Sequence, residues 1–256
     1  MSDLARMTTF EAEEALSKAS LAVIAVGSLE QHGPHLPLMT DSAVAELFAE
    51  RIVSELGDDA VLLPPIRYGL SEHHLGFAGT VTLRPGTMLG LLADIFESLR
   101  HHGLQRVLVV NGHGGNIDAL RLAARLARRD HGMMIASVMW AVVAADLARE
   151  AASSPSYGHA CEVETSVMMA LLPEEVRTDE ITRGGRHIHD VLTEPPGGSV
   201  DEPVWLHEWS DDGAVGWPDA ANEEDGARIV SQVLERVVGY ARRMIERTPG
   251  GGNSDE

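Results

Sequence analysis

The sequence predicts an α/β fold in which a mainly parallel sheet is covered by helices. Apolar runs of strand length alternate along the chain with longer segments whose apolar residues recur at helical spacing. The links between them are short, as is typical of strands joined by crossover helices. The runs are continuous instead of alternating, which suits strands that are buried on both faces of a parallel sheet.

Four apolar runs are expected to form this sheet. LAVIAV comes first, AVLLPPI is a second short strand, RVLVV is the clearest central strand, and MMIASVMW follows it. Each is bounded by segments rich in glycine, proline or polar residues. The expected strands cover residues 21–26, 60–66, 106–110 and 133–140.

Six segments with helical spacing are expected to form the covering helices. Thr8 or Thr9 can cap the first, and glutamates in its N-terminal half favour the helix dipole. Glycines end the second, third and fourth helices, and Pro173 ends the fifth. The expected helices cover residues 9–18, 42–56, 87–102, 117–131, 160–172 and 223–246.

One domain spanning 1–248 is expected, because no repeat and no linker divides the chain. Residues 183–220 are rich in Gly, Pro, Asp and Trp, which predicts a long loop. The end of the chain, 249–256, is polar and glycine-rich, and we expect it to be disordered.

The charge balance excludes several classes of partner. The chain carries 39 acidic and 20 basic residues, a formal charge of -19, which repels nucleic acid and anionic membranes. Its single cysteine, Cys161, rules out an intrachain disulfide and a thiolate metal cluster. The N-terminus does not have the pattern of a signal peptide. We expect a cytoplasmic protein that acts on a small-molecule substrate.

Two histidine-containing loops follow strands and should meet at one edge of the sheet. Glu30 and His32 lie two apart in an extended loop, so both can face one point. Asp41 begins the next helix, and His113 follows the neighbouring strand. Carboxylate and imidazole ligands suit zinc, manganese or ferrous iron. Taken alone, Asp41 is more typical of a helix cap and Glu-x-His of a polar surface. Their convergence predicts a metal site.

Two more segments add candidates. NGHGGN lets the backbone of Gly114, Gly115 and Asn116 approach a ligand closely, although it lacks the lysine of a phosphate-binding P-loop. In GHACEVETS, His159 is a candidate general acid or base and Glu164 a further carboxylate ligand. Acidic residues in a first helical turn also simply favour the dipole, and Glu162 shares that position. Either His73 or His74 can reach substrate; His74 is our candidate.

These motifs, in this order, resemble the creatininase family of amidohydrolases. The resemblance runs through nearly the whole chain. It rests on VGSLEQHGPHLPLMTD, YGLSEHHLGFAGTVTL, VLVVNGHGGN, GHACEVETS and GAVGWPDAANEEDGARI. It implies a three-layer α/β/α fold, a homo-oligomer that is often a hexamer, and two divalent ions of zinc, manganese or iron.

The resemblance also implies how the ligands are shared. Glu30, Asp41 and His113 would hold one metal, and His32 with a bridging Asp41 would hold the second. Creatinine-hydrolysing members place another carboxylate where this chain has Gly115. Glu164 is the candidate replacement, and Glu162 is the alternative. His159 matches the histidine proposed to shuttle protons in the family.

The implied activity is hydrolysis of a small cyclic amide, a formamide or a related carbonyl compound, at a C–N bond other than a peptide bond. The departure at Gly115 argues against creatinine itself. Alternatives on the same site are an inosose-type hydrolase and a mycofactocin-type peptidase. A lyase or isomerase of a polyol ketone, and a binding module that has lost catalysis, are the remaining alternatives.

Overall fold

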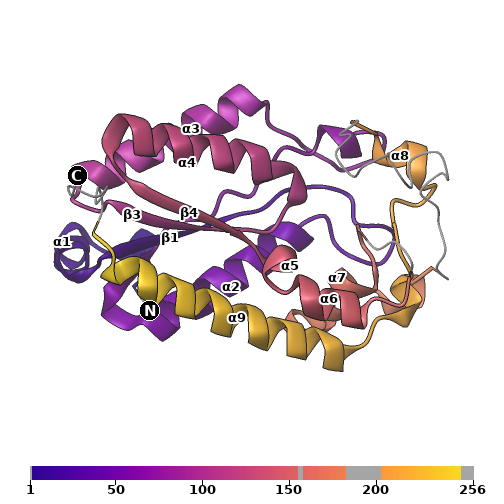
Figure 1. Cartoon of the computed structure of the whole chain (residues 1–256). Helices are drawn as coiled ribbons and strands as arrows, with labels where there is room; N and C mark the ends of the chain where they lie inside the picture. Colours follow the sequence, from indigo (N-terminus) through magenta and orange to yellow (C-terminus); the bar gives the residue numbers. More distant parts are fainter. Residues whose placement is uncertain (1, 155–157, 183–202, 249–256) are drawn as a thin grey trace, which may run out of the picture.

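The computed structural model describes residues 2–154, 158–182 and 203–248. Its centre is a sheet of four parallel strands in the order β2-β1-β3-β4 (Figure 1). The strands are β1 (Leu21–Val26), β2 (Ala60–Leu62), β3 (Arg106–Asn111) and β4 (Met134–Met139). The expected parallel α/β sheet is confirmed.

The order of the strands decides which face each helix covers. The chain moves outward from β1 to β2, then back past β1 to β3, and on to β4. Because such crossovers are right-handed, the reversal puts α2 (Thr40–Leu56) on one face, and α3 (Pro85–His101) and α4 (Ile117–His131) on the other. The face of α2 is completed by α7 (Glu162–Leu171) and α9 (Glu223–Glu246). The result is three layers (Figure 1).

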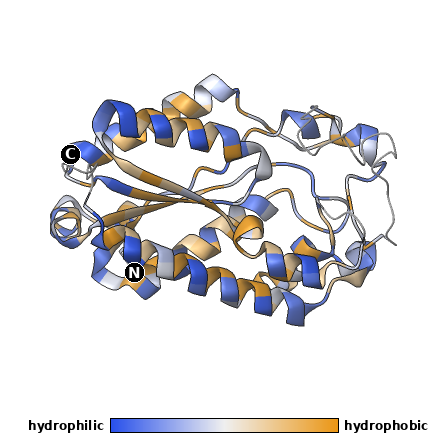
Figure 2. Ribbon diagram, in the orientation of Figure 1, coloured by the Kyte–Doolittle hydropathy of each residue, from blue (hydrophilic) through white to orange (hydrophobic). Residues whose placement is uncertain are grey.

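Successive residues of the buried strands supply two separate cores. In β1, Leu21 and Val23 pack with the layer of α2, α7 and α9, whereas Ala22 and Ile24 pack with α3 and α4. This alternation is the two-residue period of a strand, applied to a sheet covered on both faces. Figure 2 shows the consequence: apolar strands lie between helices that each have an apolar and a polar side.

Several boundaries differ from those expected. β2 ends at Leu62, four residues early, and the prolines at 64 and 65 have no N–H to continue the ladder. α2 begins at Thr40, so Asp41 lies in its first turn and does not cap it. Within the described part of 183–220, a short helix interrupts the expected loop. The helices that were not expected are α5 (Trp140–Val143), α6 (Ala145–Ala151) and α8 (Leu206–Trp209).

The remaining elements are α1 (Thr9–Lys18) and short 3-10 turns. Thr8, one of the two expected caps, begins α1, and Glu11 bonds back to it in a reciprocal capping box that was not foreseen. The turns cover Leu4–Arg6, Gly57–Asp59, Glu72–His74, Gly114–Asn116, Pro173–Glu175, Thr178–Glu180 and Pro218–Ala220. No described helix is long and apolar enough to cross a membrane. The tail 249–256, and most of the loop with His187 and His189, lie outside the described residues.

A close approach between α7 and α9 locks the layer that carries part of the site. A Cβ added at Gly226 of α9 would lie 1.8 Å from the carbonyl oxygen of Ser166 in α7. Only glycine therefore fits at this crossing. At Gly239, in the same helix, the nearest atom to an added Cβ is 3.6 Å away, at Arg243.

Gly226→Ala should lower the free energy of unfolding by about 1–3 kcal/mol, because α7 and α9 must separate. Gly239→Ala is the matched control and should raise it by up to about 1 kcal/mol, since alanine favours a helix where space is open. Urea unfolding of both variants measures the difference. Equal free energies in the two variants would contradict this packing.

Candidate metal centre

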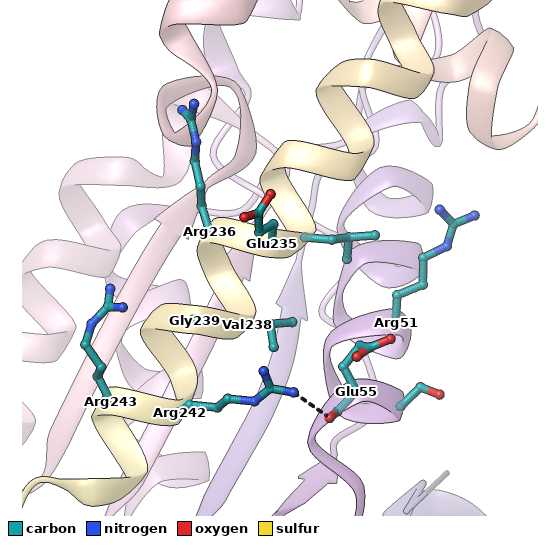
Figure 3. Close-up of a pocket in the computed structure, with 10 residues that line it drawn as sticks. Arg51, Glu55, Glu235, Arg236, Val238, Gly239, Arg242 and Arg243 are labelled. Carbon is teal, nitrogen blue, oxygen red and sulfur yellow. Dashed lines mark hydrogen bonds between the residues drawn. The ribbon is translucent and has the colours of Figure 1, made fainter.

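A cavity of about 310 Å³ lies at the carboxyl ends of β1 and β3. After β1 the chain adds β2 on one side of it, and the next strand, β3, is added on the other side. The strand order therefore reverses between β1 and β3, and α/β sheets bind ligands at such a switch point. A larger cavity of about 850 Å³ lies between α2 and α9 (Figure 3). Its lining of mainly arginine, glutamate and aliphatic residues includes no residue predicted for the site. The smaller cavity is therefore the candidate site, because it is the one lined by the predicted carboxylates and histidines.

Glu30, Asp41 and His113 form the first group of candidate ligands. His113 Nδ1 lies 3.1 Å from Glu30 Oε2 and 3.1 Å from Asp41 Oδ2. One ligand atom from each residue lies within 4.8 Å of the others, which is close enough to share an ion. All three are buried: 1% of Glu30 is exposed, and 4% each of Asp41 and His113.

His32, Asp41 and Glu164 form a second group at the same separation. His32 Nε2 lies 3.1 Å from Asp41 Oδ1, whereas the other oxygen of Asp41 faces His113. Asp41 therefore presents one carboxylate oxygen to each group. This is the arrangement that a bridging ligand requires.

The outer nitrogen of each ligand histidine is held by a backbone carbonyl. His113 Nε2 donates to Leu70 O at 2.9 Å, and His32 Nδ1 donates to Glu30 O at 3.2 Å. Such hydrogen bonds fix the tautomer and turn the other nitrogen toward a metal. The inward nitrogens are those that lie beside the carboxylates, as expected for metal ligands.

The charges of this cluster are mutually dependent. Burial and the nearby Asp41 raise the pKa of Glu30, but His113 outweighs them, and the pKa falls to about 2. Burial lowers the pKa of His32, yet Asp41 and Glu164 raise it to about 9. Burial also raises the pKa of Glu164, to about 7. The ionised carboxylates thus favour the protonated form of His32. A bound metal ion could supply the compensating positive charge in place of that proton.

Unpaired oxygen atoms test whether a cation fits. Both carboxylate oxygens of Glu30, and Asp41 Oδ2, are buried without a hydrogen-bond partner. Buried polar atoms are seldom left in this state unless an ion or water completes them. Oxygen and imidazole donors are those of catalytic zinc and manganese sites. The residues present therefore fit a divalent metal.

Gly115 leaves no room for a carboxylate of its own. A Cβ there would lie 2.3 Å from Leu70 O and 2.5 Å from His113 Nε2. Any side chain at this position would clash with the ring of His113, a candidate ligand. The carboxylate that the structure brings beside His32 and Asp41 is that of Glu164 in α7.

Glu162, the alternative, is fully occupied by structural hydrogen bonds. Its Oε1 accepts from Ser153 N, Ser154 N and Ser154 Oγ at 2.6–3.0 Å, and its Oε2 accepts from Trp217 N at 2.8 Å. Four donors satisfy this buried carboxylate without a metal. Glu162 therefore ties two loops to the start of α7, and Glu164 is left facing the site.

Gln31 orders two further histidines, a role that the sequence analysis did not foresee. Its side-chain Nε2 donates to His74 Nδ1 at 3.0 Å, so the proton of His74 is on Nε2, 3.3 Å from Glu30 Oε1. Its backbone carbonyl accepts from His159 Nε2 at 2.6 Å, which leaves Nδ1 of His159 free to accept a proton. Burial lowers the pKa of His74 to about 2 and of His159 to about 3, so both are neutral.

Three of the four expected substrate-binding residues, His74, Gly114 and Gly115, line the cavity. Asn116 does not. Its Oδ1 accepts from Leu70 N at 2.9 Å, and its Nδ2 donates to Gly27 O and Asn111 Oδ1. The geometry supports a role for Asn116 in holding the loop, and does not support the expected contact with substrate.

Comparison with known proteins identifies relatives along most of the chain. Residues 5–240 match the creatininase family, described as creatinine amidohydrolase. A mycofactocin precursor peptide peptidase from Mycolicibacterium smegmatis is 34% identical over 226 residues, 85% of this chain and 83% of that protein. A 3-dehydro-scyllo-inosose hydrolase from Thermotoga maritima is 26% identical over 96% of this chain and 84% of its own.

Solved structures share the fold. A protein from Bacteroides fragilis described as a creatinine amidohydrolase is 26% identical, covers 96% of this chain and 97% of its own, and gives a TM-score of 0.81. A manganese creatininase that is 23% identical covers 96% of this chain and 99% of its own, with a TM-score of 0.79. The resemblance drawn from the motifs is confirmed: the chain belongs to the creatininase family.

Proposed function

We propose that this chain, as a member of the creatininase family of metal-dependent hydrolases, hydrolyses an amide C–N bond of a small molecule with the help of two divalent ions. The observation that carries the proposal is Asp41, whose two oxygens face two separate ligand groups. Zinc, manganese or iron suits these donors. When bound, such a pair activates water and polarises a carbonyl group.

The residues around the ions would transfer the proton, bind the oxyanion and position a ligand. His159 accepts a proton at Nδ1, its free nitrogen, while its Nε2 stays bonded to Gln31 O. It then returns that proton to the leaving nitrogen as a general acid. The backbone N–H groups of Gly114 and Gly115, at the cavity wall, are suited to hold the developing oxyanion. His74 holds Glu30 in place.

Similarity between sequences favours a second candidate, cleavage of a peptide bond. The peptidase relative is 34% identical to this chain, against 26% for the inosose hydrolase. Hydrolysis of a small amide and cleavage of a peptide bond both break an amide bond, and both can use the same donor set. Incubation of the metal-loaded protein with small cyclic amides and formamides, beside short peptides and inososes, separates them by the product released.

We further propose that the protein works in the cytoplasm on a small molecule, as a homo-oligomer, and by family resemblance as a hexamer. The charge of -19 supports the absence of nucleic acid and membrane partners. Light scattering of the protein in solution gives the number of chains. A monomeric mass would reject the oligomer.

Stripping the metal with a chelator should abolish hydrolysis, and adding zinc, manganese or ferrous iron back should restore it. In isotopically labelled water the product must carry solvent oxygen, because hydrolysis adds water across the C–N bond. Mass spectrometry of the product measures this. Product without the label would favour a lyase or isomerase reaction. If the metal-loaded protein turned over none of the compounds on the panel, a binding module that has lost catalysis would be favoured.

Glu164→Gln should reduce the bound metal from about two ions to about one per chain, because the second group loses a carboxylate. Glu162→Gln is the matched control, two residues away. It should keep both ions but lose about 1–3 kcal/mol of stability, since an amide NH₂ would face donors. Metal analysis and urea unfolding report the two effects. The reverse pattern would make Glu162 the ligand.

His159→Ala should keep both metals and lower turnover by roughly 10²–10⁴. His102→Ala, exposed at the end of α3, is the control and should leave turnover unchanged. Metal analysis decides between two roles, because His159 also lies within 4.8 Å of donor atoms of Glu30 and His32. A fall in metal content in His159→Ala would show that it is a ligand instead.

A further inference from the structure

A buried hydrogen bond ties the turn that follows His32 to helix α7. His35 Nε2 lies 2.8 Å from Thr165 Oγ1, and both residues are 0% exposed. His35 comes three residues after His32, and Thr165 is the neighbour of Glu164 in α7. The bond therefore joins the two segments that carry His32 and Glu164, which are far apart in the sequence.

His35 is the donor of this bond. Burial and the nearby His32 lower the pKa of His35 to about 4, so its ring is neutral and carries one N–H proton. Its Nδ1 is buried and has no hydrogen-bond partner. Because buried N–H groups are paired more strictly than buried acceptors, the proton is on Nε2. His35 Nε2 thus donates to Thr165 Oγ1.

A histidine beside a hydroxyl group can also be a base beside its nucleophile. That role does not fit this pair. Neither His35 nor Thr165 lines the cavity of the metal centre, and neither is exposed, so no substrate reaches them. Their bond can act on the site only through the backbone segments that it joins.

The segment on the side of His35 is a tight turn. His32 and Leu36 pair as an antiparallel bridge, and Gly33, with a φ of 64°, lets the chain reverse between them. The backbone carbonyl of His35 also accepts from Arg177 N at 2.9 Å. His35 is thus held by its ring and by its backbone, and the turn carries that position to His32.

The segment on the other side is the first part of α7. Thr165 and Glu164 are consecutive residues of this helix, so their backbones move together. Glu164 Oε2 accepts from Ala160 N at 2.6 Å, which fixes the direction of the carboxylate. The bond from His35 to Thr165 therefore sets the separation of His32 and Glu164.

We propose that His35 and Thr165 are positioning residues that hold His32 and Glu164 at the separation that one metal ion requires. The inference rests on the proposed function for the presence of two ions. The first ligand group contains no residue of α7. Loss of the bond should therefore weaken the ion of the second group alone.

Thr165→Val tests the proposal, because it keeps the shape of the side chain and removes the acceptor. Zinc is withdrawn from the loaded protein with a chromophoric chelator, which gives the affinity of each ion. One of the two ions should bind roughly 10–100-fold more weakly in this variant, as is typical when the support of a metal ligand is lost. The other should be unchanged. Thr165→Ser keeps the hydroxyl group and should retain both affinities.

Two further variants test the same bond from its other end and assign the weakened ion. His35→Leu removes the donor and should reproduce the selective loss. Glu164→Gln is expected to keep only the ion of the first group. Adding Thr165→Val to Glu164→Gln should therefore leave the affinity of that remaining ion unchanged.

Leu99→Ala is the control for a general loss of stability. Leu99 is buried in α3, just before the amino end of β3, and so lies at the opposite edge of the sheet from the metal centre. This variant should unfold at a lower urea concentration and keep both zinc affinities. Urea unfolding also confirms that the other variants are folded.

Several results would overturn the inference. These are unchanged affinities in Thr165→Val and His35→Leu, an equal loss of both ions, a further loss in the Glu164→Gln background, or a selective loss in Leu99→Ala. A wild type that binds a single zinc ion would reject the two-ion proposal and this inference with it. Two ions with the selective loss, but no hydrolysis of any amide, would reject the proposed activity and leave the positioning role supported.

Discussion

The rest of the site depends on the burial of two carboxylates, Glu30 and Asp41, against one another. Removing such charges from water costs several kcal/mol per ion unless partners replace the lost hydration. His32, His74 and His113 supply part of that replacement. Three carboxylate oxygens of the pair still have no hydrogen-bond partner. A cluster with this deficit is stable when cations complete it, which is why the fold and the metal are linked.

The fold gathers these groups by bringing distant segments to one edge of the sheet. Glu30 and His113 follow adjacent strands, and Asp41 enters from the first turn of α2. A Cβ at Gly112 would lie 2.0 Å from Asp41 O, so the end of β3 can touch α2 only because residue 112 is glycine. The same crowding at Gly115 excludes a side chain there. Glu164 on α7, which lies beside His32 and Asp41, is the carboxylate that we propose in its place.

Sequence patterns predicted the parts of this structure that depend on local periodicity. The four strands, the long helices and the edge shared by Glu30 and His113 follow from apolar runs and their order. The short helices α5, α6 and α8 have too few turns to show a period. Residue roles that depend on contacts between distant segments could not be predicted from the sequence either. Glu162 and Glu164 look alike in the first turn of one helix, and only tertiary contacts separate them.

The most direct test of the central claim is anomalous diffraction from crystals of the zinc-loaded protein, measured on both sides of the zinc absorption edge. Two anomalous peaks per chain are expected, both within ligand distance of Asp41, one also bound by Glu30 and His113 and the other by His32 and Glu164. A single peak, or two peaks with Glu164 outside ligand distance of both, would contradict it.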